Sequence, residues 1–143
     1  MIKSNLTEIQ LDVESVRRGQ PFDINLKVRV ADENLFIEGA YLLIEGVEII
    51  SVPKNRQDKN KKNLAQKEML SNMNIITKQR IKVANEKKLE ANERYVWDAK
   101  AQLASDCQPS YHGKYCNYFY RVKAYLDCCD NAADSGWINL AVL

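Results

Sequence analysis

The chain has 143 residues and a formal net charge of +2, with 45% hydrophobic and 28% charged residues. This balance is typical of one globular domain with a core of its own, and no apolar run approaches the roughly 18 residues that a membrane-spanning helix needs. Because the start of the chain has no apolar block of signal-peptide length, we expect a single domain over residues 1–143, located in the cytoplasm.

Positive charge is concentrated in the middle of the chain. Residues 52–94 hold 12 Lys/Arg against 5 Asp/Glu, so this segment is basic and the flanking parts are acidic. An asymmetry of this kind concerns partners and solubility rather than the fold.

The amino-terminal third alternates apolar and polar residues, which is typical of strands because successive side chains on a strand face opposite ways. Residues 6–13 and 22–30 are predicted strands, and residues 35–52 form a third extended region. Gly39 and Gly46 lie inside that region and predict a bulge or a local bend.

The composition changes after residue 52. Residues 53–62 contain no apolar residue except Pro53, and good helix formers follow them. The sequence therefore predicts a loop or one short helix within residues 54–72. Residues 74–83 alternate weakly and predict a strand, and the charged residues 86–93 predict a hairpin loop or a short helix.

The carboxyl-terminal half contains the clearest alternation. Residues 95–103 and 118–126 are predicted strands, and residues 137–143 predict a final, largely buried strand. About seven strands without a dominating helix indicate an all-β, immunoglobulin-like antiparallel β-sandwich. Aromatic side chains are expected to build its core and rim: Trp97, Tyr115, Tyr118, Tyr120, Tyr125 and Trp137.

The four cysteines are Cys107, Cys116, Cys128 and Cys129. In the cytoplasm thiols stay reduced by default, so we expect free cysteines that act as small apolar residues. A disulfide between Cys107 and Cys116 and a metal site are the alternatives, although a zinc site needs four ligands at a recognisable spacing that is missing here.

The sequence contains no clear catalytic motif. His112 is the only histidine, and it is expected to be a polar tip on a turn, with a pair to Cys107 as the alternative. Asp127, Asp130 and Asp134 could supply oxygen ligands to Ca²⁺, but a solvated acidic loop is the simpler interpretation. No phosphate-binding glycine loop is present, so we expect no enzyme activity, metal or cofactor.

A basic cluster in the central segment is the best candidate for partner binding. Such a cluster attracts phosphorylated partners or an anionic membrane surface, and the alternative is a solvated loop. Nucleic acid is unlikely as a partner, because the segment has no aromatic side chain for base stacking. The predicted contact residues are Lys54, Arg56, Lys59, Lys61 and Lys62.

The turn Pro109-Ser110-Tyr111-His112-Gly113 followed by the strand Tyr120-Arg121-Val122-Lys123-Ala124-Tyr125-Leu126 resembles a known family. Alpha-arrestins carry a Pro-Ser-aromatic-x-Gly turn before a Tyr-x-Val-Lys/Arg-Ala strand in their amino-terminal domain. The order of strands is similar over nearly the whole chain, which implies an arrestin-type β-sandwich. A vacuolar-sorting retromer subunit and bacterial sporulation-control proteins share this fold, and Leu126-Asp127 with Ala132-Ala133-Asp134 resembles the latter.

Two features depart from the alpha-arrestin pattern. Leu103-Ala104 stands where the family has Leu-Pro, and the Pro-Pro-x-Tyr motif that recruits ubiquitin ligases is absent, so ligase recruitment does not carry over. The resemblance implies an adaptor or scaffold that binds other proteins, often in membrane trafficking or signalling.

Two other functions remain open from the sequence. One is a small cysteine-dependent redox protein or enzyme using Cys107, Cys116 and His112. The other is a structural subunit that supplies one half of a two-domain arrestin fold, whose unpaired apolar face would form a homodimer.

Overall fold

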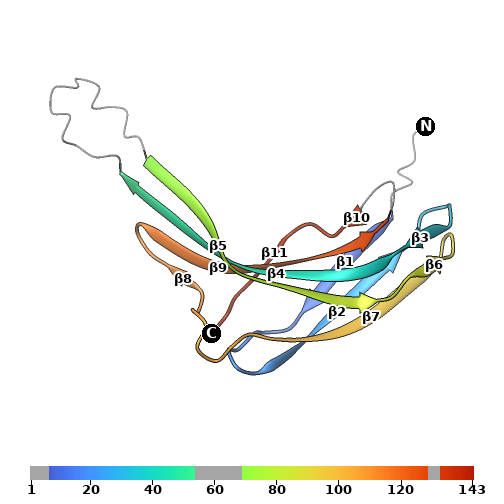
Figure 1. Cartoon of the computed structure of the whole chain (residues 1–143), viewed down its shortest axis with the longest axis horizontal. Coiled ribbons are helices and arrows are strands. Elements are labelled where there is room, and N and C mark those ends of the chain that lie inside the picture. The colour runs from blue at the N-terminus through green and yellow to red at the C-terminus, as the bar shows by residue number, and fades with distance from the viewer. Residues whose placement is uncertain (1–6, 54–68, 129–132) are drawn as a thin grey trace, which may run out of the picture.

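A computed structural model of the chain describes residues 7–53, 69–128 and 133–143 (Figure 1). Every regular element in these residues is a strand. The strands are β1 (Glu8–Val13), β2 (Pro21–Arg29), β3 (Leu35–Ile37), β4 (Gly39–Pro53), β5 (Met69–Ala84), β6 (Lys87–Leu89), β7 (Arg94–Gln102), β8 (Tyr111–His112), β9 (Cys116–Asp127), β10 (Ala133–Asp134) and β11 (Ile138–Leu140).

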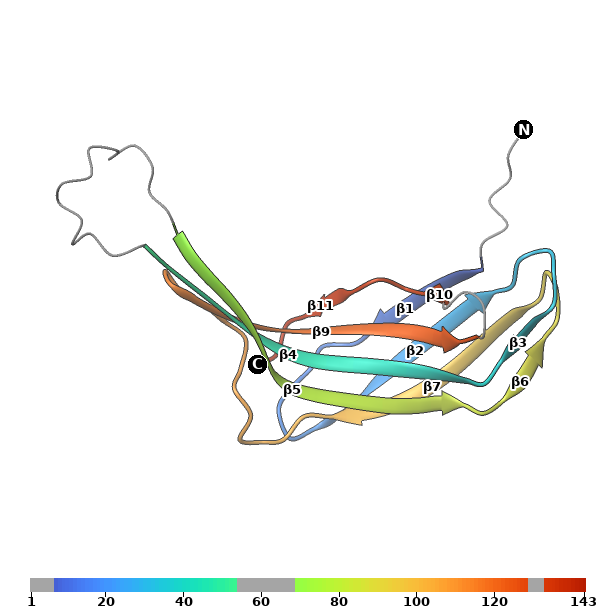
Figure 2. The ribbon, with the colours of Figure 1, turned by 45° about the horizontal axis from the view of Figure 1, so that its top comes forward.

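The strands form two main antiparallel sheets. The smaller sheet has the order β1-β2-β7, and the larger has the order β10-β9-β4-β5, with β8 and β11 also pairing with β9. The short strands β3 and β6 form a separate pair at one end of the molecule, as Figure 2 shows. The long strands of the two sheets make the two layers of a sandwich.

The core lies between the inward faces of these layers. Strand β2 buries every second side chain, and β9 does the same on the opposite layer. Each such apolar side chain contributes about 1.5–3 kcal/mol by leaving water. The buried residues of these two strands are Phe22, Ile24, Leu26, Val28, Tyr118, Tyr120, Val122, Ala124 and Leu126.

The predicted bend at Gly46 is confirmed. The register between β4 and β5 shifts between Ala40 and Tyr41 and again between Gly46 and Val47. A Cβ atom on Gly46 would lie 2.5 Å from Oγ1 of Thr77 and 2.8 Å from the hydroxyl of Tyr118, so only glycine fits where the strand bends.

All seven predicted strand regions contain a strand, but some boundaries were wrong. The region 35–52 is interrupted at Glu38 and forms both β3 and β4. The segment 86–93 is not a helix: it forms β6 and a turn in which Asn92 has a φ of 63° and donates its N–H to the carbonyl of Ala31 at 2.8 Å.

The helix expected within residues 54–72 is wrong for its last residues, because β5 begins at Met69. Residues 54–68 lie outside the described part of the chain. Helix propensity is a local preference, and here the ladder with β4 overrides it. The last segment is also less buried than expected: Trp137 is 36% exposed and Leu143 is 67% exposed.

Candidate interaction surface

The predicted contact residues fall in the connection between β4 and β5. Pro53 at the end of β4 pairs with Met69 at the start of β5, so β4 and β5 are the two strands of one long hairpin. The segment lies outside the described residues, and the prediction for its basic side chains remains a prediction. These residues are Lys54, Arg56, Lys59, Lys61 and Lys62.

The part of this hairpin nearest the connection extends away from the sandwich layers (Figure 1). We call residues 48–53 and 69–76 the hairpin arm. Its apolar side chains are unusually exposed, since Met73 is 54%, Ile75 is 48% and Ile76 is 53% accessible. Met73 and Ile75 are two positions apart and lie opposite Ile49 and Val47, so these apolar groups share one face of the arm, whereas Ile76 is the extra residue at the register shift.

Strand β5 forms one edge of the larger sheet. Within the described residues, β4 is the only strand that pairs with β5. Strand β7 is likewise the last strand of the smaller sheet, and the two edges come close without pairing. The outer edge of β5 therefore offers backbone groups that another extended chain could pair with.

The outward face of β5 beyond the arm carries three cations at alternate positions: Lys78, Arg80 and Lys82. All three are exposed, and they lie opposite Glu45, Leu43 and Tyr41 of β4. We call these three residues the cationic row. The alternation within the predicted strand 74–83 could have identified the row from the sequence, and it was overlooked in favour of the basic loop.

The middle member of the cationic row is held by two aromatic rings. The guanidinium of Arg80 lies 3.9 Å from the centre of the Tyr41 ring, and its Nε donates a hydrogen bond to the hydroxyl of Tyr125 at 2.8 Å. The two tyrosine rings stack at 5.4 Å. Among the described residues, neither Lys78 nor Lys82 has a side-chain partner.

A buried ion pair lies beside the cationic row. Glu45 is only 3% exposed, and its Oε1 accepts hydrogen bonds from Nη2 and Nε of Arg121 at 2.7 and 3.0 Å. The guanidinium of Arg121 stacks on Trp137 at 4.0 Å, and Lys123 approaches the same ring at 4.8 Å. Arg121 thus balances the charge of Glu45, and within the described part of the chain the cationic row has no carboxylate partner.

The outward face of the smaller sheet has a different charge pattern. Lys27 pairs with Asp12 at 3.3 Å, and Lys100 pairs with Asp23 at 3.0 Å. The hydrogen bond that the Lys100 ammonium donates to the Asp23 carboxylate raises the pKa of Lys100 above its usual value. Two of the four cations on these strands thus pair with carboxylates, and the strands carry cations and carboxylates in equal number.

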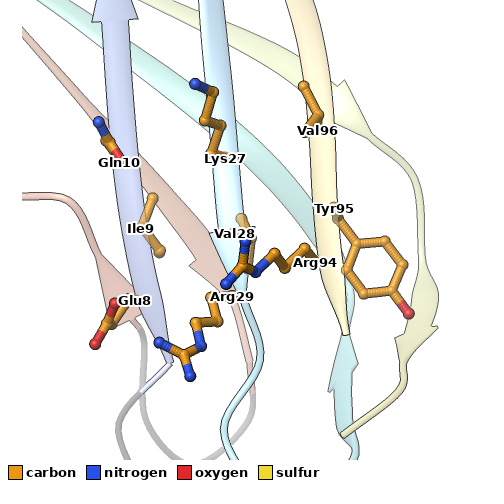
Figure 3. Close-up of a pocket in the computed structure, with 9 residues that line it drawn as sticks. All are labelled: Glu8, Ile9, Gln10, Lys27, Val28, Arg29, Arg94, Tyr95 and Val96. Atoms are coloured by element: carbon orange, nitrogen blue, oxygen red, sulfur yellow. The ribbon is translucent and has the colours of Figure 1, made fainter. Parts of the chain in front are cut away.

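An open hollow of about 540 Å³ lies at one end of this smaller sheet (Figure 3). The strand register places Glu8, Arg29 and Arg94 in one cross-strand row. Figure 3 shows the two arginine side chains reaching across the sheet towards β1. The residues that line the hollow include no serine, threonine, cysteine or histidine.

The cysteines do not form the disulfide considered above. Cys107 and Cys116 are free thiols, and Cys129 lies outside the described residues. His112 is exposed in β8, where it pairs with Asn117, as expected of a polar tip on a turn. No group of three metal-ligating side chains gathers within the described residues, and Asp130 lies outside them.

The turn before β9 is anchored by a buried tyrosine. The hydroxyl of Tyr120 donates to the carbonyl of Gln108 at 2.5 Å. Burial, with a hydrogen bond to Cys107 as the next cause, raises the pKa of Tyr120 far above its usual value. Tyr118 and Tyr120 belong to the core as predicted, whereas Tyr115 is 41% exposed.

No family model matches the chain, and no curated protein matches it in sequence. Its structure is similar to the crystal structure of Spo0M, a sporulation control protein from Bacillus subtilis, with a TM-score of 0.65 and 14% sequence identity. The match covers 95% of this chain and 49% of Spo0M, so the chain spans about half the length of that protein.

This likeness concerns the fold, since the sequences have diverged far. The closer relationship to alpha-arrestins remains a prediction. A search of the described residues for a helix long and apolar enough to cross a membrane finds none. With its antiparallel sheets and its similarity to Spo0M, the chain has the arrestin-like β-sandwich fold.

Proposed function

We propose that the chain is an adaptor module that binds a partner protein through the hairpin arm. The observation that carries the proposal is the exposure of Met73, Ile75 and Ile76 on a hairpin that extends away from the sandwich. Exposed apolar groups that cluster among polar ones mark interaction sites on soluble proteins. An arrestin-like fold supports a binding role and gives no catalytic role to the chain.

The basic segment extends this proposed contact. Lys54 follows directly on Pro53, so the chain itself joins the apolar arm to the cluster of Lys54, Arg56, Lys59, Lys61 and Lys62. Apolar groups supply most of the binding energy at such a contact, and surrounding charges select and steer the partner. We therefore propose a partner protein with an acidic, phosphorylated or membrane-associated surface.

Site-specific crosslinking in the source cell tests the proposal. A photo-crosslinking amino acid would replace Ile75 on the arm or, as the control, Gln10 on the exposed face of the smaller sheet. We expect a discrete protein to be captured from position 75 and not from position 10. Equal capture from both positions, or capture only of a second copy of this chain, would overturn the adaptor proposal.

The captured partner would then be purified and titrated against variants. We expect Met73→Ser with Ile75→Ser to weaken binding by about tenfold or more, as truncation of a buried apolar anchor does. Val96→Ser is the matched control, because Val96 is 58% exposed on the other sheet. A variant in which the five basic residues are changed to Gln tests the loop, and unchanged affinity in that variant would remove the loop from the contact.

A further inference from the structure

We propose that the open edge of β5 binds an extended peptide segment by strand addition, and that it selects segments with an anionic side chain at every second position. This inference deepens the adaptor function proposed above and rests on it. It uses the cationic row, which lies further along β5 than the hairpin arm.

The first requirement is a backbone that can pair. In the described residues β5 pairs with β4 alone and ends the larger sheet. An extended peptide that runs along such an edge gains main-chain hydrogen bonds, and its alternate side chains then lie beside those of the edge strand. Lipid headgroups and nucleic acids cannot supply this ladder.

The second requirement is a charge pattern with the period of a strand. Lys78, Arg80 and Lys82 occupy successive outward positions, which lie about 7 Å apart along a strand. Side chains directly opposite in an added strand approach to about 5 Å, where opposite charges attract and like charges repel. Three cations in one row therefore favour anions at three alternate positions of the peptide.

The two lysines of the row are available to such a ligand. The guanidinium of Arg80 lies over Tyr41 of β4 and bonds to Tyr125 of β9, so it adds positive charge to this face but has to leave these rings to reach an anion at the open edge. The flanking Lys78 and Lys82 have no side-chain partner within the described residues that an incoming anion would have to displace. The neighbouring carboxylate, Glu45, is held by Arg121 and does not compete.

The third requirement concerns the positions between the anions. Ile81 and Val83 point to the other side of β5, where they are half-buried and pack against the core. Apolar residues of an added strand would cover their exposed parts and extend the core. The preferred segment therefore alternates anionic and apolar residues, with carboxylate or phosphate as the anion.

The edge of β7 does not meet the second requirement. Its outward positions carry Arg94, Val96, Asp98 and Lys100, which include both signs of charge, and Lys100 is already paired with Asp23. Nucleic acid fits the cationic row poorly for another reason. The Tyr41 ring is covered by Arg80 and the Trp137 ring by Arg121, so bases would have to displace a cation in order to stack.

Synthetic peptides of about nine residues, long enough to span the row, test the inference. One peptide alternates Glu and Val, a second has phosphoserine in place of Glu, and a third has the composition of the first with the Glu residues grouped at one end. A fourth is the first peptide with N-methyl groups on alternate backbone nitrogens, which prevents pairing without changing its charge. Affinity is measured by fluorescence anisotropy on the full chain.

We expect both alternating peptides to bind, and the grouped and N-methylated peptides to bind at least about tenfold more weakly. The ratio of the first two affinities identifies carboxylate or phosphate as the preferred anion. Hydrogen exchange should show new protection of β5 amides and none in β1 or β7. Equal binding of the alternating and grouped peptides, or no binding of any peptide, would overturn the inference.

Protein variants provide the second arm of the test. Replacing Lys78, Arg80 and Lys82 by Gln should abolish discrimination between the alternating and grouped peptides. The matched control replaces three exposed cations of the smaller sheet, Lys27, Arg29 and Arg94, by Gln. It should bind the peptides like the wild type. If anionic vesicles or single-stranded RNA bind through the row and the peptides do not, the peptide assignment is wrong. If the Gln variant aggregates and the wild type binds no peptide, the inference is wrong, and the cationic row instead prevents the β5 edges of two copies from pairing.

The two proposals fail separately. The variant with Met73→Ser and Ile75→Ser should still bind the alternating peptide, because the arm lies outside the row. A partner captured at position 75 together with no peptide binding would refute only the strand-addition inference. Peptide binding in the absence of any partner captured at position 75 would refute only the role of the arm.

Discussion

The outward faces of the two sheets differ in how their charges are arranged. The smaller sheet has as many carboxylates as cations on β1, β2 and β7, and neighbouring strands pair them, as Lys27 pairs with Asp12 and Lys100 with Asp23. On β5, β4 and β9 of the larger sheet, cations outnumber carboxylates around Glu45 and rest on aromatic rings. Side chains alternate between the two faces of a strand in both sheets. The outward faces differ in how charges are arranged across neighbouring strands, and we expect this arrangement to decide which face accepts an anionic partner.

The energetics of the two faces differ as well. An exposed ion pair such as Lys27–Asp12 gains little, because water screens both charges. The Glu45–Arg121 pair is buried, so each charge depends on the other once water is gone. Arg80 and Arg121 of the larger sheet are therefore held in place by their contacts, whereas exposed cations such as Lys27 can move.

The largest expected effect comes from breaking the buried pair. Arg121→Ala leaves the Glu45 carboxylate buried without its partner and should lower the free energy of unfolding by about 3–5 kcal/mol. The matched change on the smaller sheet, Lys27→Ala, should cost about 0–1 kcal/mol. Urea unfolding of both variants checks the difference, and equal losses would show that the two faces do not differ in this way.

The second prediction concerns the strand register, which is continuous in the smaller sheet and shifted twice between β4 and β5. Gly46→Val places atoms where Thr77 and Tyr118 already lie and should cost about 1–3 kcal/mol through overpacking. Arg29→Val, on the exposed face of β2, should change stability by about 0.5 kcal/mol or less. Thermal unfolding compares the stabilities of the two variants. An unchanged stability of Gly46→Val would mean that the backbone at the bend can shift to make room for the larger side chain.

A third prediction follows from the inward faces. The larger sheet buries the hydroxyl of Tyr120, whose pKa is raised by burial, whereas β2 of the smaller sheet buries only apolar groups. Above about pH 10 the unfolded chain loses this proton and the folded chain keeps it, so stability should fall by about 1.4 kcal/mol per pH unit from this group. Tyr120→Phe should remove that part of the alkaline slope in urea unfolding at pH 9 to about 11, and an unchanged slope would contradict the assignment.

The smallest effect is expected on the cationic row itself. Arg80→Lys keeps the charge but loses the planar stacking on Tyr41 and the geometry of the hydrogen bond to Tyr125, which should cost about 0.5–1 kcal/mol. Arg94→Lys on β7 has no such ring contact within the described residues and should be neutral. Differential scanning calorimetry distinguishes the two, and identical melting of both variants would show that the rings do not hold Arg80.

Several features of the fold were predictable from the sequence because they depend on local alternation. The inward faces of β2, β7 and β9 follow a period of two that needs no knowledge of neighbouring strands. Gly46 indicated a bend for the same local reason, since a glycine inside a strand pattern removes a side chain. The short strands β6, β8 and β10 were not predicted, because two or three residues are too few for a period to emerge.

The candidate surface depended on the tertiary structure. Glu45 and Arg121 are separated by 76 positions along the chain and meet only because β4 pairs with β9. Met69 and Leu70 belonged to the segment for which a short helix was considered, and they are strand residues because they pair with β4. The sequence alone determined which side chains of a strand share a face, through the alternation of the backbone. Only the order of strands determined that, among the described residues, β5 lies at an edge and its three cations have no carboxylate partner, because strand order arises from long-range packing rather than from any local period.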